Sequence, residues 1–294
     1  MTRFDSVPWS AVDKVTADYL DVHPHLRDRW LLVQTLATAV PRRALLNALG
    51  IEADWRVLDV GTGFGPVAHE LAGATGARVV GADIDSEKLD AASSMGVDLG
   101  NIDWPGDAGT AVFARADVHD LPFGAAVFDA AVVRFLYQHL HDYDTVTSEL
   151  ARVVRRGGLV CVIDVDDALS ITYPDISPAY ERLRDVFTAV QEAGGGDRQI
   201  GRKLAHLLEA GGFTVTAVLV IPQASYGPST PGDPGRRLLI ERFALARSSA
   251  VAGETDRARG IRCADPRAGR GVCSGPVAHR SPRGRGGAPA ITVR

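Results

Sequence analysis

A short apolar stretch that ends in a glycine-rich turn constrains this chain more than any other feature. Residues 57–68 read VLDVGTGFGPVA, with glycines at positions 61, 63 and 65. Glycine has no Cβ atom, so the backbone can turn sharply there and approach a ligand closely. A helix that begins at Pro66 would offer its free N–H groups to a carboxylate or a phosphate. The segment therefore predicts a strand, a ligand-binding turn and a helix, in that order.

The same alternation continues along the chain. Further apolar segments typical of strands lie at 78–83, 111–116, 126–133, 158–164 and 213–221. Segments with helical periodicity lie at 66–74, 86–95, 143–155, 178–193 and 198–210. Nearly continuous apolar strands that alternate with helices are typical of a parallel sheet covered on both faces. We expect an α/β fold, a Rossmann-like doubly wound sheet that is mostly parallel.

The chain divides into four predicted parts. Residues 1–50 are expected to form a helical lid, 51–222 the core domain and 223–254 a helical extension. Residues 255–294 form a tail rich in Arg, Gly and Pro, which we predict to be disordered. The tail carries nine arginines against two acidic residues. It is either a basic arm for nucleic acid or a non-homologous end of the kind that a frameshift produces. It offers no convincing final strand, so the last strand of the sheet is expected to be missing or altered.

Composition narrows the possible partners and the compartment. A formal net charge of -4 gives no reason to expect nucleic acid or an anionic membrane as a partner. No apolar run is long enough to cross a bilayer, and the first residues lack the apolar stretch of a signal peptide. Three cysteines provide neither a disulfide framework nor a zinc-binding spacing. We therefore expect a cytoplasmic protein, either a monomer or a homodimer.

An acidic residue ends the second predicted strand. In nucleotide-binding α/β folds, an acid at this position accepts hydrogen bonds from ribose hydroxyls. Asp83 is the better candidate, because Asp85 is placed to stabilise the start of the following helix. Pro66 occupies the third glycine position of the dinucleotide fingerprint, which argues against a nicotinamide-dependent oxidoreductase.

Five features in order along residues 55–165 resemble the class I S-adenosylmethionine-dependent methyltransferases, in particular the domain of the ubiquinone and menaquinone biosynthesis enzymes. They are the glycine turn, the strand end at 79–85, and the segments 115-RADVHDLPF-123, 127-VFDAAVVRFLYQHL-140 and 152-RVVRRGGLVCVID-164. In the last segment Arg156 stands where the family usually has proline. A weaker likeness continues over 194–213.

The resemblance implies S-adenosylmethionine as the cofactor and assigns residues to it. The glycine turn would hold the amino-acid end, Asp83 the ribose and Asp117 the adenine amino group, with the N–H of Val118 beside it. The full set of implied cofactor residues is Asp59, Gly61, Thr62, Gly63, Gly65, Asp83, Ile84, Asp117, Val118 and Arg134.

The substrate side is expected after the fourth and fifth strands, where ligands bind in open α/β sheets. His139 is the candidate general base because its ordinary pKa suits proton transfer near neutral pH; alternatively, it only packs the loop. Predicted substrate contacts are Tyr137, Gln138, Asp166 and Arg202, although Arg202 is equally well explained as a solvated charge. The acids Asp164, Asp166 and Asp167 lie in one loop, whereas a metal site needs ligands from separate segments, so no metal is predicted.

These observations predict methyl transfer to an oxygen or nitrogen atom of a small molecule, such as a secondary metabolite. One alternative is a non-catalytic or impaired S-adenosylmethionine-binding protein. A nicotinamide-dependent oxidoreductase and a nucleic-acid methyltransferase are disfavoured. The chain contains neither the Asn-Pro-Pro-Tyr or Asp-Pro-Pro-Tyr motif used on base amino groups nor the Pro-Cys dipeptide used on cytosine carbon.

Overall fold

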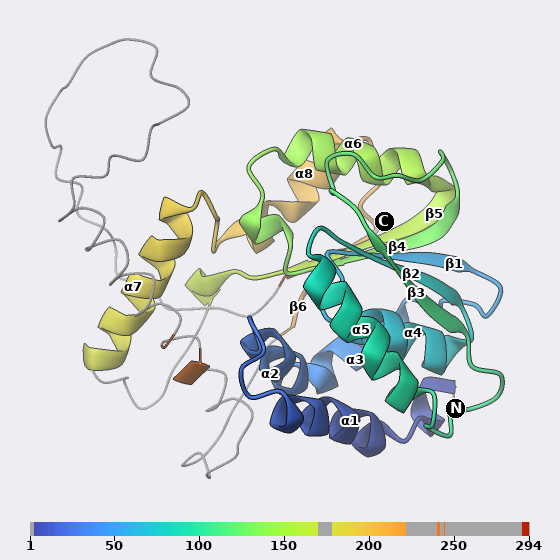
Figure 1. Ribbon diagram of the computed structural model, residues 1–294. Coiled ribbons are helices and arrows are strands. Elements are labelled where there is room, and N and C mark those ends of the chain that lie inside the picture. Colours follow the sequence, from blue (N-terminus) through green and yellow to red (C-terminus); the bar gives the residue numbers. More distant parts are fainter. Residues whose placement is uncertain (1–2, 170–177, 222–239, 242–243, 245–289, 294) are drawn as a thin grey trace, which may run out of the picture.

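The fold is built on one seven-stranded sheet. The structure, a computed structural model, describes residues 3–169, 178–221, 240–241, 244 and 290–293. The strand order is β3-β2-β1-β4-β5-β7-β6, and the first five strands in this order run parallel (Figure 1). The strands are β1 (Arg56–Val60), β2 (Arg78–Asp83), β3 (Thr110–Arg115), β4 (Phe128–Arg134), β5 (Val154–Asp164), β6 (Ala217–Val220) and β7 (Ala290–Val293). The predicted α/β class is confirmed.

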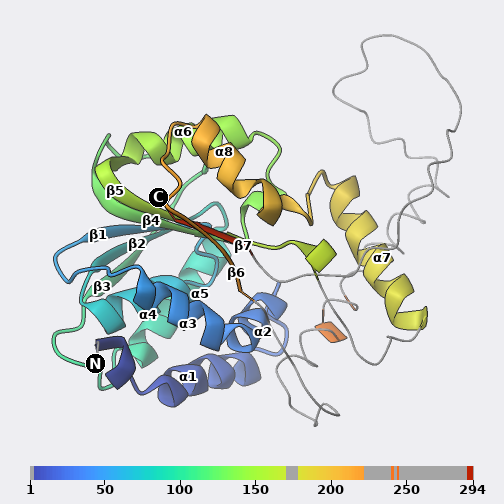
Figure 2. The same ribbon diagram turned by 180° about the vertical axis from the view of Figure 1, so that it is seen from behind.

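Helices cover both faces of the sheet (Figures 1 and 2). One face carries α1 (Trp9–Val22), α2 (Trp30–Ala37), α3 (Ala39–Ala48), α4 (Pro66–Thr75) and α5 (Ser86–Leu99). The other face carries α6 (Tyr143–Val153) and α8 (Leu204–Ala210), whereas α7 (Pro178–Ala193) lies beyond the strand ends. Short 3-10 turns lie at Arg3–Ser6, Tyr137–His139, Asp167–Leu169 and Ile200–Lys203. Within the described ranges, no helix has the length and apolarity needed to cross a membrane.

The apolar strands supply two hydrophobic layers, one on each side of the sheet. Val57 of β1 belongs to the layer under α4 and α5, whereas the next residue, Leu58, belongs to the layer under α6 and α8. Successive side chains of a strand point to opposite faces, so a strand between two covered faces must be apolar throughout. This requirement explains why the parallel strands could be found from their sequences.

The structure corrects the expectation of a missing or altered last strand. Strand β7 lies between β5 and β6 and runs antiparallel to both, with Val293 opposite Cys161 on one side and Ala217 on the other. Only four residues of the Arg-rich tail form this strand, too few for a clear pattern. Residues 255–289 of the tail, and all but three residues of the predicted extension at 223–254, lie outside the described ranges.

A buried ion cluster joins the N-terminal helices to α4. The carboxylate of Glu70, whose side chain is 3% exposed, accepts hydrogen bonds at 2.7 Å from both Arg42 and Arg43 of α3. Arg43 also pairs with Asp13 of α1 at 2.6 Å. Burial alone would raise the pKa of Glu70, but the two arginines lower it overall, so the carboxylate stays charged.

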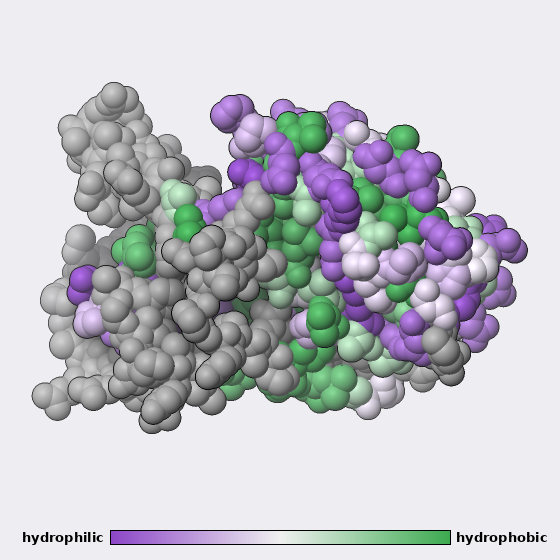
Figure 3. Space-filling view, turned by 90° about the horizontal axis from the view of Figure 1, so that it is seen from below, coloured by the Kyte–Doolittle hydropathy of each residue, from purple (hydrophilic) through white to green (hydrophobic). Residues whose placement is uncertain are grey.

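The outer surface of these helices is partly apolar. Val22 at the end of α1 is 74% exposed and Val40 of α3 is 80% exposed. The view from below shows apolar surface interspersed with charged surface on this side of the molecule (Figure 3).

We predict that Glu70→Gln lowers the free energy of unfolding by about 3 kcal/mol, because it leaves the buried Arg42 without a counter-charge and leaves Arg43 with Asp13 alone. Urea unfolding measures this loss. The matched change Glu52→Gln, at an exposed position, should alter the stability by less than about 0.5 kcal/mol.

The difference between the parent chain and Glu70→Gln should also depend on pH. A carboxylate whose pKa is lowered by folding contributes stability above its unfolded pKa, and that contribution is lost as the pH falls. The difference should therefore shrink below about pH 4.5. A difference that stays constant down to pH 3 would contradict the ion-pair account.

Candidate cofactor and substrate site

The turn between β1 and α4 has the conformation that its glycines predict. Gly61, Gly63 and Gly65 have φ angles of +70°, +54° and +73°, in the left-handed region that other residues rarely adopt. The backbone N–H groups of Gly61 and Thr62 both donate to the carbonyl oxygen of Ala82 in β2, at 2.8 and 3.0 Å. The turn is thereby fixed against the neighbouring strand.

The acid at the end of β2 contacts this turn directly. The N–H of Gly63 donates to Oδ2 of Asp83 at 2.8 Å, and the N–H of Asp85 donates to Oδ1 at 3.0 Å. A carboxylate offers about four lone-pair positions, so Asp83 can accept two more hydrogen bonds. Asp85 instead caps α5 by accepting from the N–H of Glu87, which is the helix-start role that the sequence suggested for it.

Asp59, at the end of β1, stabilises the turn through Thr62. Its buried carboxylate accepts a hydrogen bond from the hydroxyl of Thr62 at 2.6 Å. Burial raises the pKa of Asp59 to about 6, and the Thr62 hydrogen bond and the charge of Arg134 limit that rise. These contacts account for an acid at this position.

Two adjoining cavities open beside the turn. One, of about 450 Å³, lies between the turn, the end of β4 and α2; the other, of about 230 Å³, lies between the ends of β2 and β3. Both are lined by Gly61, Asp83, Ile84 and Leu136. Ile84, which lines both cavities, is 60% exposed.

Asp117 and Val118 line the smaller cavity. The Asp117 carboxylate accepts from the N–H of His119 at 2.9 Å and lies 2.7 Å from Nδ1 of the same residue. These two contacts lower the pKa of Asp117, so it is an anion at neutral pH. The structure thus brings the predicted adenine-binding residues next to Asp83 and Gly61.

The end of β4 carries a strained residue beside a half-buried cation. Phe135 has a φ of +57°, and its N–H donates to Ile163 of β5 at 2.8 Å. The guanidinium of Arg134 lies 4.1 Å above the Phe135 ring and donates to the Thr38 hydroxyl. Burial and the nearby charge of Arg42 lower the pKa of Arg134 to about 9. The sequence did not predict the left-handed conformation of Phe135.

Of the predicted residues after β4, His139 lines the larger cavity. Burial of its ring and the charges of Arg198 and Lys88 lower the pKa of His139 to about 4, although part of the residue remains exposed. Its imidazole is therefore neutral at pH 7.

The predicted substrate contacts of Tyr137 and Gln138 are corrected by the structure. Tyr137 is fully buried, and its hydroxyl lies 3.0 Å from that of Thr147 in α6. Gln138 is buried too, and its side chain bonds to Arg198. Neither residue lines the two cavities, because the 3-10 turn directs both side chains into the protein.

Asp166 and Arg202 bind each other. Both oxygens of the buried Asp166 accept from the Arg202 guanidinium, at 2.7 and 2.8 Å, and neither residue lines the two cavities. Asp164 is also buried, and burial raises its pKa to about 7. In the parts of the chain that the structure describes, no three acidic, His or Cys side chains are grouped as metal ligands.

Residues 58–162 match the family described as a methyltransferase domain. Over these residues the chain is similar to class I S-adenosylmethionine-dependent methyltransferases. It is similar to an O-methyltransferase from Penicillium expansum, with 30% identity over 193 residues that cover 62% of this chain and 64% of that protein. It is also similar to a ubiquinone/menaquinone biosynthesis C-methyltransferase from Rhizobium leguminosarum bv. trifolii, with 29% identity over 155 residues, 51% of this chain and 56% of that one. The chain thus spans between half and two thirds of the length of these curated relatives.

Solved methyltransferase structures have the same fold. The geranyl diphosphate C-methyltransferase from Streptomyces coelicolor aligns over 92% of this chain and 86% of its own, with a TM-score of 0.53 and 14% identity. At this identity the likeness supports the fold alone.

The N-terminal helices, which the sequence predicted as a lid, contribute residues to the larger cavity that were not among the predicted site residues. Trp30, Leu31, Gln34 and Thr35 of α2 line the larger cavity, and Lys88 of α5 joins them. The polar Gln34 and Thr35 within an otherwise apolar segment are the sequence signal that could have found them.

We predict that Gly63→Ala weakens binding of S-adenosylhomocysteine by tenfold or more, because the added Cβ enters the space where the ligand backbone approaches; tenfold corresponds to about 1.4 kcal/mol. Gly50→Ala is a matched control: its φ of +62° is similar, and a Cβ at either glycine meets nothing within 4 Å. Both changes should cost about 1 kcal/mol of stability. Calorimetric titration should find weakened binding only for Gly63→Ala, and equal affinities would count against the turn as the binding site.

Proposed function

We propose that this chain binds S-adenosylmethionine across the two adjoining cavities and transfers its methyl group to an oxygen or nitrogen atom of a small molecule. The observation that carries the proposal is the 2.8 Å contact between Gly63 of the turn and Asp83, at the boundary of both cavities. This contact brings Asp83 next to a backbone that a ligand can approach closely, which supports Asp83 as the acid that binds the ribose.

The charges around the cavities match the parts of the cofactor. Asp83 would accept the ribose hydroxyls, and Asp117 with Val118 would hold the adenine. Within the described residues, Arg134 has no acidic partner within ion-pair distance, and it lines the larger cavity. A half-buried cation that lines a cavity and has no ion pair favours an anionic ligand, which supports Arg134 as the residue that holds the cofactor carboxylate.

The acceptor is proposed to lie in the part of the larger cavity under α2. The bound cofactor supplies a methyl group on a sulfonium, and the chain has to hold the nucleophile in line with it and exclude water. Trp30 and Leu31 provide apolar walls there, whereas Gln34 and His139 provide polar contacts. A neutral His139 has a free lone pair with which to take a proton from an acceptor hydroxyl.

The named relatives methylate different atoms, one oxygen and the other carbon. The acceptor therefore has to be identified by experiment. Incubation of the chain with methyl-labelled cofactor and a whole-cell extract of the source organism should label a small molecule. Labelling of protein or nucleic acid alone would contradict a small-molecule substrate.

We predict that Asp83→Ala weakens S-adenosylhomocysteine binding by about 10- to 100-fold, because it removes charged hydrogen-bond acceptors from the ribose. Asp85→Ala removes the nearby helix cap and should lose about 1 kcal/mol of stability, with affinity changed by less than about threefold. Calorimetric titration of both variants distinguishes the two acids. An unchanged affinity in Asp83→Ala would refute the ribose assignment.

If His139 is the base, His139→Gln should lower kcat by about 100-fold or more and leave cofactor affinity unchanged. His141→Gln changes a neighbouring exposed histidine and is the matched control. A base whose pKa is about 4 is already deprotonated at higher pH, so kcat of the parent chain should stay level from pH 7 to pH 5. An unchanged kcat in His139→Gln would exclude this role, and a decline in kcat of the parent chain with a midpoint near pH 6.5 would contradict the lowered pKa of His139.

A further inference from the structure

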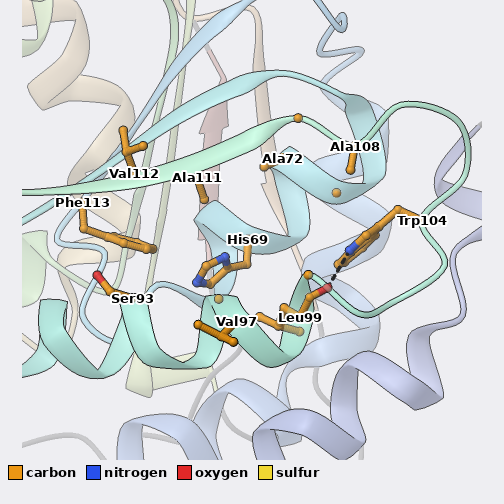
Figure 4. Close-up of a pocket in the computed structure, with 14 residues that line it drawn as sticks. His69, Ala72, Ser93, Val97, Leu99, Trp104, Ala108, Ala111, Val112 and Phe113 are labelled. Carbon is orange, nitrogen blue, oxygen red and sulfur yellow. Dashed lines mark hydrogen bonds between the residues drawn. The ribbon is translucent and has the colours of Figure 1, made fainter.

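A third cavity, of about 500 Å³, lies at the β3 edge of the sheet, between α4, α5 and β3 (Figure 4). None of the residues that line it lines the two cavities of the proposed cofactor site. Its volume falls within the usual range of small-molecule pockets. The proposed function makes no use of this cavity.

Small residues leave room for two large side chains in its walls. A Cβ atom at Gly73 of α4 would lie 2.3 Å from the ring of Trp104, and one at Gly96 of α5 would lie 2.8 Å from the ring of His69. Larger residues at either glycine would displace these rings. The absence of a side chain at these two glycines thus leaves the space that the rings of His69 and Trp104 occupy.

His69 presents an unused hydrogen-bond acceptor. The residue is 9% exposed, and Nε2 lies 2.9 Å from the carbonyl oxygen of Ala92. A carbonyl can only accept, so Nε2 carries the hydrogen, and in a neutral ring Nδ1 is then an acceptor. Burial lowers the pKa of His69, which keeps the ring neutral. Among the described residues, no group donates to Nδ1.

The other walls are mainly flat and apolar. Phe113 of β3 meets the His69 ring edge-on at 5.1 Å, and Val97 and Leu99 of α5 line the opposite side (Figure 4). Trp104 closes one end, held by a hydrogen bond from its Nε1 to the carbonyl oxygen of Leu99 at 3.0 Å. Such walls suit an aromatic ring system, because aromatic pairs add to the effect of apolar burial.

We propose that this cavity is a second binding site, for a planar aromatic molecule that carries one N–H or O–H donor. The donor bonds to Nδ1 of His69, and the ring system fills the space between Phe113, Val97 and Trp104. The site lies one side chain from the glycine turn, because the Phe113 ring occupies the space beside Gly65.

Three indoles of similar shape test the proposal on the full chain. Indole and 3-methylindole carry the N–H donor. 1-Methylindole has the same size as 3-methylindole but has no donor. In amide NMR titrations, the two donors should shift the signals of Gly73, Gly96 and Gly109. 1-Methylindole should bind about 2- to 10-fold more weakly than 3-methylindole, the effect of one neutral hydrogen bond.

Two variants separate the donor contact from the apolar contacts. His69→Phe keeps a ring of similar size and should make 1-methylindole and 3-methylindole bind equally. Ala111→Leu fills the cavity from β3 and should abolish the binding of all three indoles. Circular dichroism of both variants checks their fold, and the comparison of probes on the parent chain does not depend on either variant.

The proposal is overturned if the parent chain shows no saturable shifts with indole, or if the shifts are confined to residues 61–65. It is also overturned if the parent chain binds 1-methylindole as tightly as 3-methylindole. Because the test reads the amides around His69, its outcome is independent of whether S-adenosylhomocysteine binds at Asp83.

Discussion

The reversal of strand order between β1 and β4 is the constraint on which the rest of the structure depends. From β1 the chain proceeds outward to β2 and β3, and then crosses back to β4 on the other side of β1. The connecting helices α4 and α5 lie on one face, and α6 lies on the other (Figure 1). Because the connections that follow β1 and β4 lie on opposite faces of the sheet, a crevice opens between the ends of these two strands. The glycine turn, Asp83 and Arg134 all lie at this crevice.

Helix α4 links the parts of the molecule that surround the crevice. Its first residue, Pro66, follows the glycine turn, and Glu70, one helical turn later, holds α1 and α3 through the two buried arginines. The preceding residue, His69, points to a different side, since successive residues of a helix are separated by about 100°. Helix α4 thus contacts the N-terminal helices, the glycine turn and the third cavity. A displacement of α4 would change the geometry of all three.

Much of the fold was predictable, because strands buried on both faces must be apolar throughout. Residues 57–60 and 78–83 show this pattern, and the glycine turn between them needs residues without a Cβ atom. The position of Asp83 at the end of an apolar strand also indicated this residue, and its carboxylate contacts the glycine turn. By contrast, β7 has only four residues, and its position depends on pairing with distant strands.

The substrate side was less predictable, because it depends on side-chain directions and on contacts between distant segments. One 3-10 turn sends Tyr137 into the core and leaves His139 at the cavity, a difference that spacing does not reveal. Asp166 and Arg202 were both recognised as polar candidates, but their mutual pairing depends on how η4 (Ile200–Lys203) packs near the end of β5. The contribution of α2 arises in the same way, from the docking of a helix that is distant in sequence.

A crystal structure of the full chain with S-adenosylhomocysteine tests the central claim most directly. The account predicts the amino-acid end of the ligand against Gly61 and Gly63, both ribose hydroxyls within hydrogen-bond distance of Asp83, and the adenine beside Asp117. A ligand bound elsewhere, or a ribose that makes no contact with Asp83, would contradict it.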